Sequence, residues 1–120
     1  MNANEILDMM RKNMGSVPAT IEKSVPVDPA LIQEHMRSKA FAMPQENAAL
    51  DEATRTLIYL AAALAGTNRA CVQAMSHRLV QMGVPAAKII ETVHITRLAM
   101  ATKIIGDAEP VFDALACAGK

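Results

Sequence analysis

Residues 57–65, Leu-Ile-Tyr-Leu-Ala-Ala-Ala-Leu-Ala, constrain the fold most, because as a helix they are apolar on every face. Such a helix in a water-soluble protein is buried all round, by its own domain or by a partner subunit. The stretch is far shorter than the roughly 20 residues that span a bilayer. The N-terminal residues also lack an apolar run of signal-peptide length. We therefore expect a cytoplasmic protein that does not enter a membrane.

The apolar residues of the chain are aliphatic rather than aromatic. Of 120 residues, 52% are hydrophobic but only 2% are aromatic, and nine are Met. Ala and Met favour closely packed helices, whereas the strands of a β-sandwich draw on aromatic and β-branched side chains. We predict an all-α fold, a compact helical bundle that forms a single domain over residues 1–120. The net charge is +0 and no basic patch is interleaved with aromatics, which gives nucleic-acid binding no support.

Start and stop signals divide the chain into about six to seven helices. The third helix should bury a face made by Leu31, Ile32, Met36 and Ala40. The first expected helix begins at Asn2 or Asn4 and ends at Gly15, the second covers residues 19–24, and the third starts at Asp28-Pro29 and precedes a loop at 43–47. The fourth runs from Asp51 to Gly66, the fifth from Thr67 or Asn68 to Gly83, and the sixth from Pro85 to near Gly106. A final helical segment is expected to be capped by Asp107.

Four segments in order resemble one known family. They are Gly15-Ser-Val-Pro18 with the later Pro26 and Pro29, Leu50-Asp-Glu-Ala-Thr-Arg55-Thr-Leu-Ile, Cys71-Val-Gln-Ala-Met75 leading to Gly83-Val-Pro, and Ile89-Ile-Glu91-Thr-Val. Their order and spacing are similar to those of the carboxymuconolactone decarboxylase and alkyl hydroperoxidase D-like family, over roughly residues 15–115. The apolar segment 57–65 and the apolar faces of the other helices predict a homo-oligomer, and the resemblance indicates a trimer or a hexamer. No cofactor is expected.

The peroxidase branch of that family carries Cys-x-x-Cys-x-x-x-His, with a Glu one helix earlier. Such chemistry needs a thiolate, a second thiol to resolve the sulfenic acid, and a base. When the family motif is aligned on Gly83, its first cysteine falls at Asn68 and its second at Cys71. Its histidine falls at Met75, and the preceding glutamate falls at Thr56. Allowing a gap brings His77 to the histidine position but still leaves one thiol. The resemblance thus implies a degenerate redox site with the single cysteine Cys71.

Cys71 is the candidate nucleophile, because it lies near a helix start, where the helix dipole favours a thiolate. The alternative is a small buried hydrophobe. Met75 and Arg78 share its helical stripe and are candidate ligand-binding residues, whereas His77 lies on a polar stripe and is expected at the surface or an interface. Cys117, near the C-terminus, could resolve Cys71 by folding back or by crossing to a neighbour, or be incidental.

His94 and Arg97, one turn apart, form a second candidate site. The resemblance to the decarboxylase branch, which uses a pocket histidine, makes His94 a catalytic candidate, and Arg97 could bind a carboxylate ligand. The alternative is an exposed or subunit-facing polar strip. Glu91-x-x-His94 has the spacing of di-iron bundles, but no second such motif is present, so no metal is expected.

The predicted function is that of a carboxymuconolactone decarboxylase family protein, with three variants open. The chain could be a thiol-dependent peroxidase or redox protein that uses Cys71. It could be a decarboxylase or isomerase acting on a small carboxylate, with His94 and Arg97 lining the pocket. It could also be a non-catalytic ligand-binding or assembly subunit.

Overall fold

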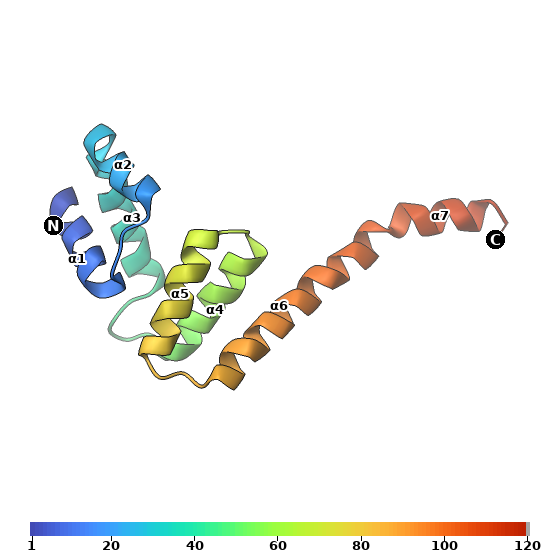
Figure 1. Ribbon diagram of the computed structural model, residues 1–120. Helices are drawn as coiled ribbons and strands as arrows, with labels where there is room; N and C mark the ends of the chain where they lie inside the picture. The colour runs from blue at the N-terminus through green and yellow to red at the C-terminus, as the bar shows by residue number, and fades with distance from the viewer. Residues whose placement is uncertain (120) are drawn as a thin grey trace.

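Seven α-helices account for most of the chain in the computed structural model, which describes residues 1–119 (for Met14, the main chain alone). Within that range no β-strand occurs, which confirms the all-α prediction (Figure 1). The helices are α1 Ala3–Met14, α2 Ala19–Val27, α3 Pro29–Ala42, α4 Glu52–Ala65, α5 Arg69–Gln81, α6 Ala86–Asp107 and α7 Glu109–Cys117.

The first three helices pack around a small apolar core of their own. The buried side chains belong to Ala3, Ile6, Leu7, Val25 and Ile32, with half-buried Met10, Val17, Ile21 and Met36 packed against them. The expected face of α3 is therefore only partly correct. Ile32 and Met36 point inward, but Leu31 is 54% exposed and Ala40 is exposed. The reason is that α3 contacts only α1 and α2, which cover a narrow stripe of it.

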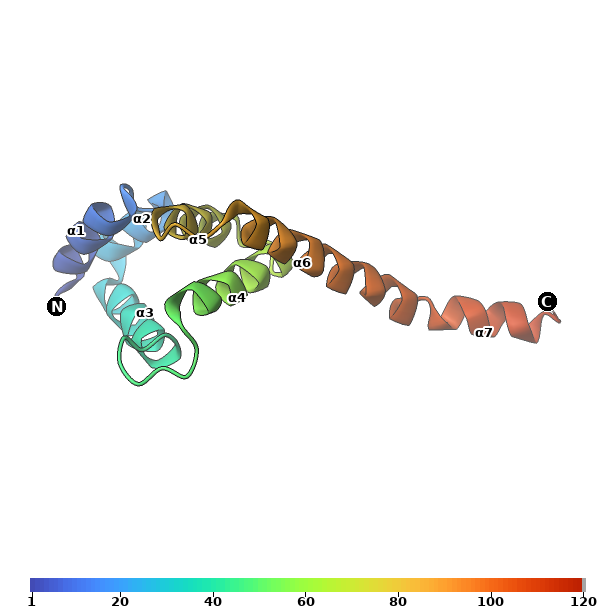
Figure 2. The same ribbon diagram turned by 90° about the horizontal axis from the view of Figure 1, so that it is seen from below.

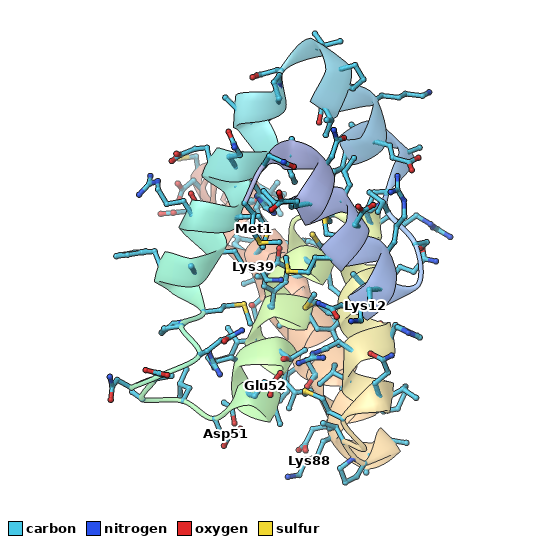
Figure 3. The ribbon with its side chains drawn as sticks, turned by 90° about the vertical axis from the view of Figure 1, so that its left-hand side faces the viewer. Met1, Lys12, Lys39, Asp51, Glu52 and Lys88 are labelled. Atoms are coloured by element: carbon cyan, nitrogen blue, oxygen red, sulfur yellow. The ribbon has the colours of Figure 1, made fainter. Side chains whose placement is uncertain are left out.

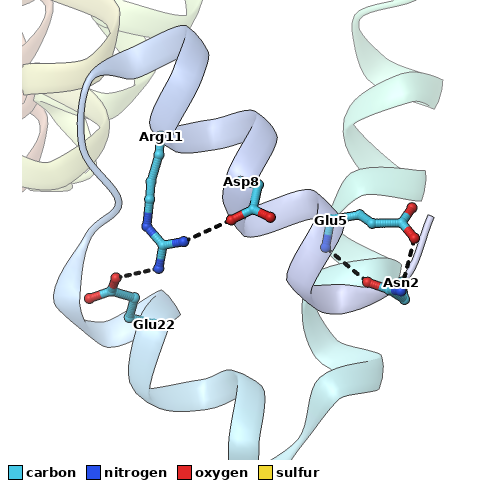
Figure 4. Close-up of polar contacts among 5 residues, drawn as sticks. All are labelled: Asn2, Glu5, Asp8, Arg11 and Glu22. Atoms are coloured by element: carbon cyan, nitrogen blue, oxygen red, sulfur yellow. Dashed lines mark hydrogen bonds and ion pairs between the residues drawn. The ribbon is translucent and has the colours of Figure 1, made fainter.

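Polar contacts at the surface fix how α1 begins and how it meets α2 (Figure 4). The Asn2 side chain accepts a hydrogen bond of 2.8 Å from the backbone N–H of Glu5, which is the helix cap that the sequence predicts. Arg11 donates to Asp8 at 3.0 Å and to Glu22 on α2 at 2.7 Å. These ion pairs are exposed, so each contributes little to stability, but together they orient α2 across α1.

Helices α4 and α5 form an antiparallel hairpin, and the first half of α6 packs on α4. The buried side chains of these three helices are Thr56, Leu60 and Ala63 from α4, Leu79 from α5 and Thr96 from α6. Only one side of the apolar segment 57–65 is covered within the chain, because Ile58 is 52% exposed. Burial on every face is therefore not achieved by the single chain.

The starts of α4 and α6 lie close together at one end of the hairpin, where Figure 3 shows Asp51, Glu52 and Lys88. The Asp51 side chain caps α4 and accepts a 2.8 Å hydrogen bond from the backbone N–H of Thr54. That hydrogen bond lowers the pKa of Asp51, and the charges of Lys88 and Arg55 lower it further. The predicted cap is thus present, and it also attracts the first turn of α6.

Two predicted boundaries are wrong. Helix α2 runs one turn beyond residue 24 and includes Pro26, because a proline in the last turn loses few helical hydrogen bonds. Asp107 does not cap the final helix but ends α6, where its carboxylate pairs with Lys103 at 2.6 Å. The break follows because Pro110 has no N–H to donate to the carbonyl of residue 106, and its ring displaces that carbonyl.

The second half of α6 and all of α7 extend away from the other helices as an arm (Figures 1 and 2). Helix α7 contacts only α6. The radius of gyration is 19.4 Å, against about 13–14 Å for a compact domain of this length. Helices α1–α5 and the start of α6 thus form the packed body. Across residues 1–119, no helix is both long and apolar enough to cross a membrane.

Replacing Leu79 with Ala should destabilise the body more than any surface change. Leu79 is fully buried between α4 and α5, so its loss leaves a cavity that costs about 2–5 kcal/mol. The neighbouring Val80 is 70% exposed, and Val80→Ala should change the free energy of unfolding by about 0.5 kcal/mol or less. Urea unfolding followed by circular dichroism measures both. Equal effects would show that the α4–α5 contact is not the core.

Candidate functional site

Cys71 is the third residue of α5 and lies in its first turn. The helix is capped by Asn68, whose side-chain oxygen accepts a 3.2 Å hydrogen bond from the backbone N–H of Cys71. Of the two predicted caps, Asn68 rather than Thr67 is the one used. The residue at the position of the family's first cysteine thus has a structural role, and its side chain holds the backbone of the remaining cysteine in place.

The Cys71 thiol contacts one side chain from the preceding helix, that of Tyr59. The Tyr59 hydroxyl lies 3.4 Å from Cys71 Sγ, close enough for a hydrogen bond in which either atom is the donor. Both residues are half-buried. Tyr59 is the only tyrosine of the chain and the one polar group in the apolar segment 57–65. The Tyr59 hydroxyl therefore has a specific partner within the protein instead of being hydrogen-bonded only to solvent.

This contact keeps the tyrosine protonated. The hydrogen bond with Cys71, burial, and the negative charge of the sulfur raise the pKa of Tyr59 to about 12. At neutral pH the phenol accordingly carries its proton and can donate it to the sulfur. A hydrogen bond to a charged acceptor is stronger than one between neutral groups. The phenol therefore stands beside the sulfur as a potential hydrogen-bond donor.

The tight turn between α4 and α5 sets this juxtaposition. The backbone N–H of Asn68 donates to the carbonyl of Ala63 at 2.9 Å, so that α4 ends in a Schellman-type turn. The left-handed residue of that turn is Thr67, with φ 54°, rather than the glycine that usually occupies this place. Gly66, which we expected to follow the end of α4, does so with an ordinary negative φ.

The remaining positions of the predicted relay carry no group that moves a proton to the thiol. Thr56, at the position of the family's Glu, is only 2% exposed, and its hydroxyl donates to the carbonyl of Glu52 at 2.8 Å. Met75 is half-buried and has no titratable group. The site therefore contains one thiol and one phenol instead of two thiols, a carboxylate and an imidazole.

Arg78, a predicted ligand-binding residue, has its guanidinium engaged. It forms an ion pair with Glu52 of α4, and both side chains are about half exposed. The pair closes the end of the α4–α5 hairpin opposite the turn at 66–68. We assign it to holding the two helices together.

The second predicted pair, His94 and Arg97, lies on α6. Both side chains are exposed, and neither has a hydrogen-bond or ion-pair partner among residues 1–119. Nothing in the single chain encloses a ligand over them. Cys117 is also exposed, on α7 at the outer end of the arm, far from α5 in both views of the ribbon (Figures 1 and 2). A disulfide needs Cα atoms within about 7 Å, so Cys117 does not fold back onto Cys71.

A hollow of about 320 Å³ lies between the α1–α2 connection and α5. His77 is exposed there, as its polar stripe predicts. Cys71 is not among the lining residues, so the hollow does not bring His77 to the thiol. The lining residues are Ser16, Pro18, Ala70, Gln73, Ala74 and His77.

Comparison with known protein families gives one match. The sequence model of the carboxymuconolactone decarboxylase family matches residues 31–113, which is more than two thirds of the chain and extends from α3 into α7. The chain belongs to the carboxymuconolactone decarboxylase family. The match includes the Tyr59–Cys71 pair and leaves out Gly15-x-x-Pro18, the first of the four resembling segments. A search of curated proteins finds no significant match.

Tyr59 is the neighbour of Cys71 that sequence reasoning missed. The signal was present, because a short connection between two helices makes them antiparallel neighbours. Tyr59 and Cys71 both lie within about two helical turns of the connection at 66–68. A phenol in an otherwise apolar helix also needs a hydrogen-bond partner when it is buried.

Tyr59 should titrate near pH 12 in the folded protein, against about 10 for a free tyrosine. As the chain has one tyrosine and no tryptophan, phenolate absorbance after a rapid pH jump reports Tyr59 alone. In Cys71→Ala the midpoint should fall, because the largest cause of the shift is removed. A wild-type midpoint near 10 while the protein is still folded would contradict the contact.

The same shift makes the fold sensitive to high pH. Because the folded-state pKa is raised above the unfolded value, the stabilising effect of Tyr59 is complete below pH about 10 and is lost as pH rises towards about 12. Tyr59→Phe should remove this pH-dependent contribution. The free energy of unfolding of the variant should therefore fall less between pH about 10 and about 12 than that of the wild type. Chemical unfolding at a series of pH values measures the difference.

Proposed function

We propose that this protein is a single-cysteine redox protein in which Cys71 reduces a peroxide. The observation that carries the proposal is the 3.4 Å contact between the Tyr59 hydroxyl and Cys71 Sγ at the start of α5. A helix N-terminus and a hydroxyl donor both stabilise negative charge on sulfur. The half-buried position also leaves part of the sulfur accessible to a small substrate.

The reaction follows from the groups present. The Cys71 thiolate attacks the terminal oxygen of a hydroperoxide, the O–O bond breaks, and the alkoxide leaves and takes a proton from water. Cys71 becomes a sulfenic acid, and the peroxide is reduced to an alcohol. Tyr59 holds the charge on the sulfur before the attack and stays protonated throughout.

The return to the thiol needs a partner molecule. Neither Asn68 nor Met75 can resolve a sulfenic acid, and Cys117 lies on the arm. An external thiol attacks the sulfenic sulfur and releases water, and a second thiol then displaces Cys71 from the mixed disulfide. We therefore expect one fast oxidation per chain followed by slow turnover with dithiol reductants.

The geometry favours this function over a decarboxylase or isomerase that uses His94 and Arg97. A carboxylate ligand needs a pocket that excludes water around its partners. Both side chains are exposed on α6 in the single chain, whereas Cys71 is half-buried beside a hydrogen-bond donor.

The test is the rate of Cys71 oxidation in a Cys117→Ser background, where only one thiol remains. Peroxide should produce a sulfenic acid that a dione probe captures, as measured by mass spectrometry. Tyr59→Phe removes one hydrogen bond to a charged sulfur, worth about 1.5–3 kcal/mol, so the rate should fall about tenfold or more. Leu64→Met, a volume-conserving change at another half-buried site of α4, should leave the rate unchanged.

Two results would reject the proposal. One is a Cys71 that is labelled only after unfolding, which would make it a core residue. The other is a folded Cys117→Ser protein in which peroxide produces no sulfenic acid at Cys71. Peroxide consumption as fast as that of a Cys-x-x-Cys peroxidase and abolished by Cys71→Ser would instead contradict the slow turnover expected above.

A further inference from the structure

The hollow between the α1–α2 connection and α5 serves neither the packing of the helices nor the thiol chemistry. Helix α1 contacts α5, and Figure 3 shows the end of α1, marked by Lys12, beside it. The volume of the hollow is about 320 Å³, at the lower end of the roughly 300–1,000 Å³ of ligand pockets. A space of this size suits a small metabolite rather than a large cofactor.

One wall of the hollow is a single face of α5. Its four residues have the spacing i, i+3, i+4 and i+7, so they share one side of the helix. The side that packs on α4 is a different one, because it carries buried Leu79 and also Cys71, which contacts Tyr59. The wall is therefore free of the contacts that hold the hairpin together. Its residues are Ala70, Gln73, Ala74 and His77.

The opposite wall is the connection between α1 and α2, which is held in place at both ends. Gly15 has a left-handed φ of 76°, and its backbone N–H donates to the carbonyl of Arg11 at 2.9 Å, which turns the chain at the end of α1. The Arg11 side chain pairs with Glu22 at 2.7 Å and so holds the start of α2 (Figure 4). Between them, Val17 packs against the core of α1–α3. The wall is thus formed before any ligand arrives, as in most binding sites.

The lining of the hollow is polar but includes no Asp, Glu, Lys or Arg. Its polar groups are the hydroxyl of Ser16, the carboxamide of Gln73 and the imidazole of His77. Each of these groups, the imidazole in its neutral form, can both donate and accept a hydrogen bond. None of the three is hydrogen-bonded to another group within residues 1–119. Because the lining contains no permanently charged group, it favours an uncharged ligand with both donors and acceptors.

We propose that the hollow binds a small uncharged nitrogen heterocycle with a hydrogen-bond donor next to an acceptor, as in a nucleobase. The Gln73 carboxamide matches such an edge, because it donates and accepts side by side and can form two hydrogen bonds with it. The ring of the ligand packs between Pro18 on one wall and the methyl groups of Ala70 and Ala74 on the other. The proposal is independent of the thiol chemistry, because Cys71 does not line the hollow.

A ligand-observed NMR titration of the full chain with adenine tests the proposal. Adenine should bind saturably, and the anions benzoate and inorganic phosphate should bind more weakly than adenine. Gln73→Leu removes the paired hydrogen bonds and should weaken adenine binding about tenfold or more.

Two further variants separate the hollow from the rest of the surface. Ala70→Leu, at an exposed helix position where a larger side chain is tolerated, should fill the hollow and weaken adenine binding by a similar factor. The matched control Gln45→Leu changes an exposed glutamine of the 43–51 loop and should bind adenine like the wild type. Circular dichroism and the unfolding midpoint show whether each variant keeps its folded body.

Three results would overturn the proposal. The first is a wild-type protein that shows no saturable binding of adenine at millimolar concentration. The second is benzoate or phosphate binding more tightly than adenine, which would make the hollow an anion site. The third is an adenine affinity that is unchanged in Gln73→Leu or in a folded Ala70→Leu, which would place the binding elsewhere. Oxidation of Cys71 is measured separately, so failure here leaves the thiol proposal standing.

Discussion

The packing of α4 against α5 is the contact on which the other elements depend. Leu60 of α4 and Leu79 of α5 are the largest fully buried side chains, and their two helices pack together. At one end the helices are joined by the turn at 66–68, and at the other by the ion pair of Glu52 with Arg78. Helix α6 packs on the outside of α4, and α1 reaches the hairpin through α5. Arg55 also donates a 2.5 Å hydrogen bond to the carbonyl of Pro44, which ties the 43–51 loop to α4.

The hairpin determines the chemistry as well as the fold. A cysteine in the first turn of α5 lies beside the last turns of α4, because the connection has too few residues to separate them. The side chain opposite it is then a phenol with a pKa of about 12. With Asn68 occupied as the cap of α5, no second thiol stands one turn before Cys71. The start of α5 thus places a single thiol beside a single phenol.

Local signals predicted the fold well, because caps act within a few residues. Asn2, Asp51 and Asn68 each accept the hydrogen bond that their position predicts. Failures occurred where a distant element or a proline decides. Leu31 is exposed because few helices reach α3. The position at which α7 starts depends on Pro110, which has no backbone N–H to donate. At the candidate site, Cys71 was singled out from its motif, but the role of Tyr59 as its partner depends on the packing of α4 against α5 across the turn.

The small side chains of the hairpin limit how much apolar surface the body buries. Ala residues allow α4 to approach its neighbours closely, but each buries little apolar area, and burial contributes about 25 cal/mol per Å². Within residues 1–119, only eight hydrophobic residues are fully buried. Ordering a chain of this length costs conformational entropy at about 1–2 kcal/mol per residue for the backbone alone. The large apolar side chains of α6 and α7 add little to this burial, because most of them are exposed. The free energy of folding therefore depends mainly on the few side chains buried in α1–α5.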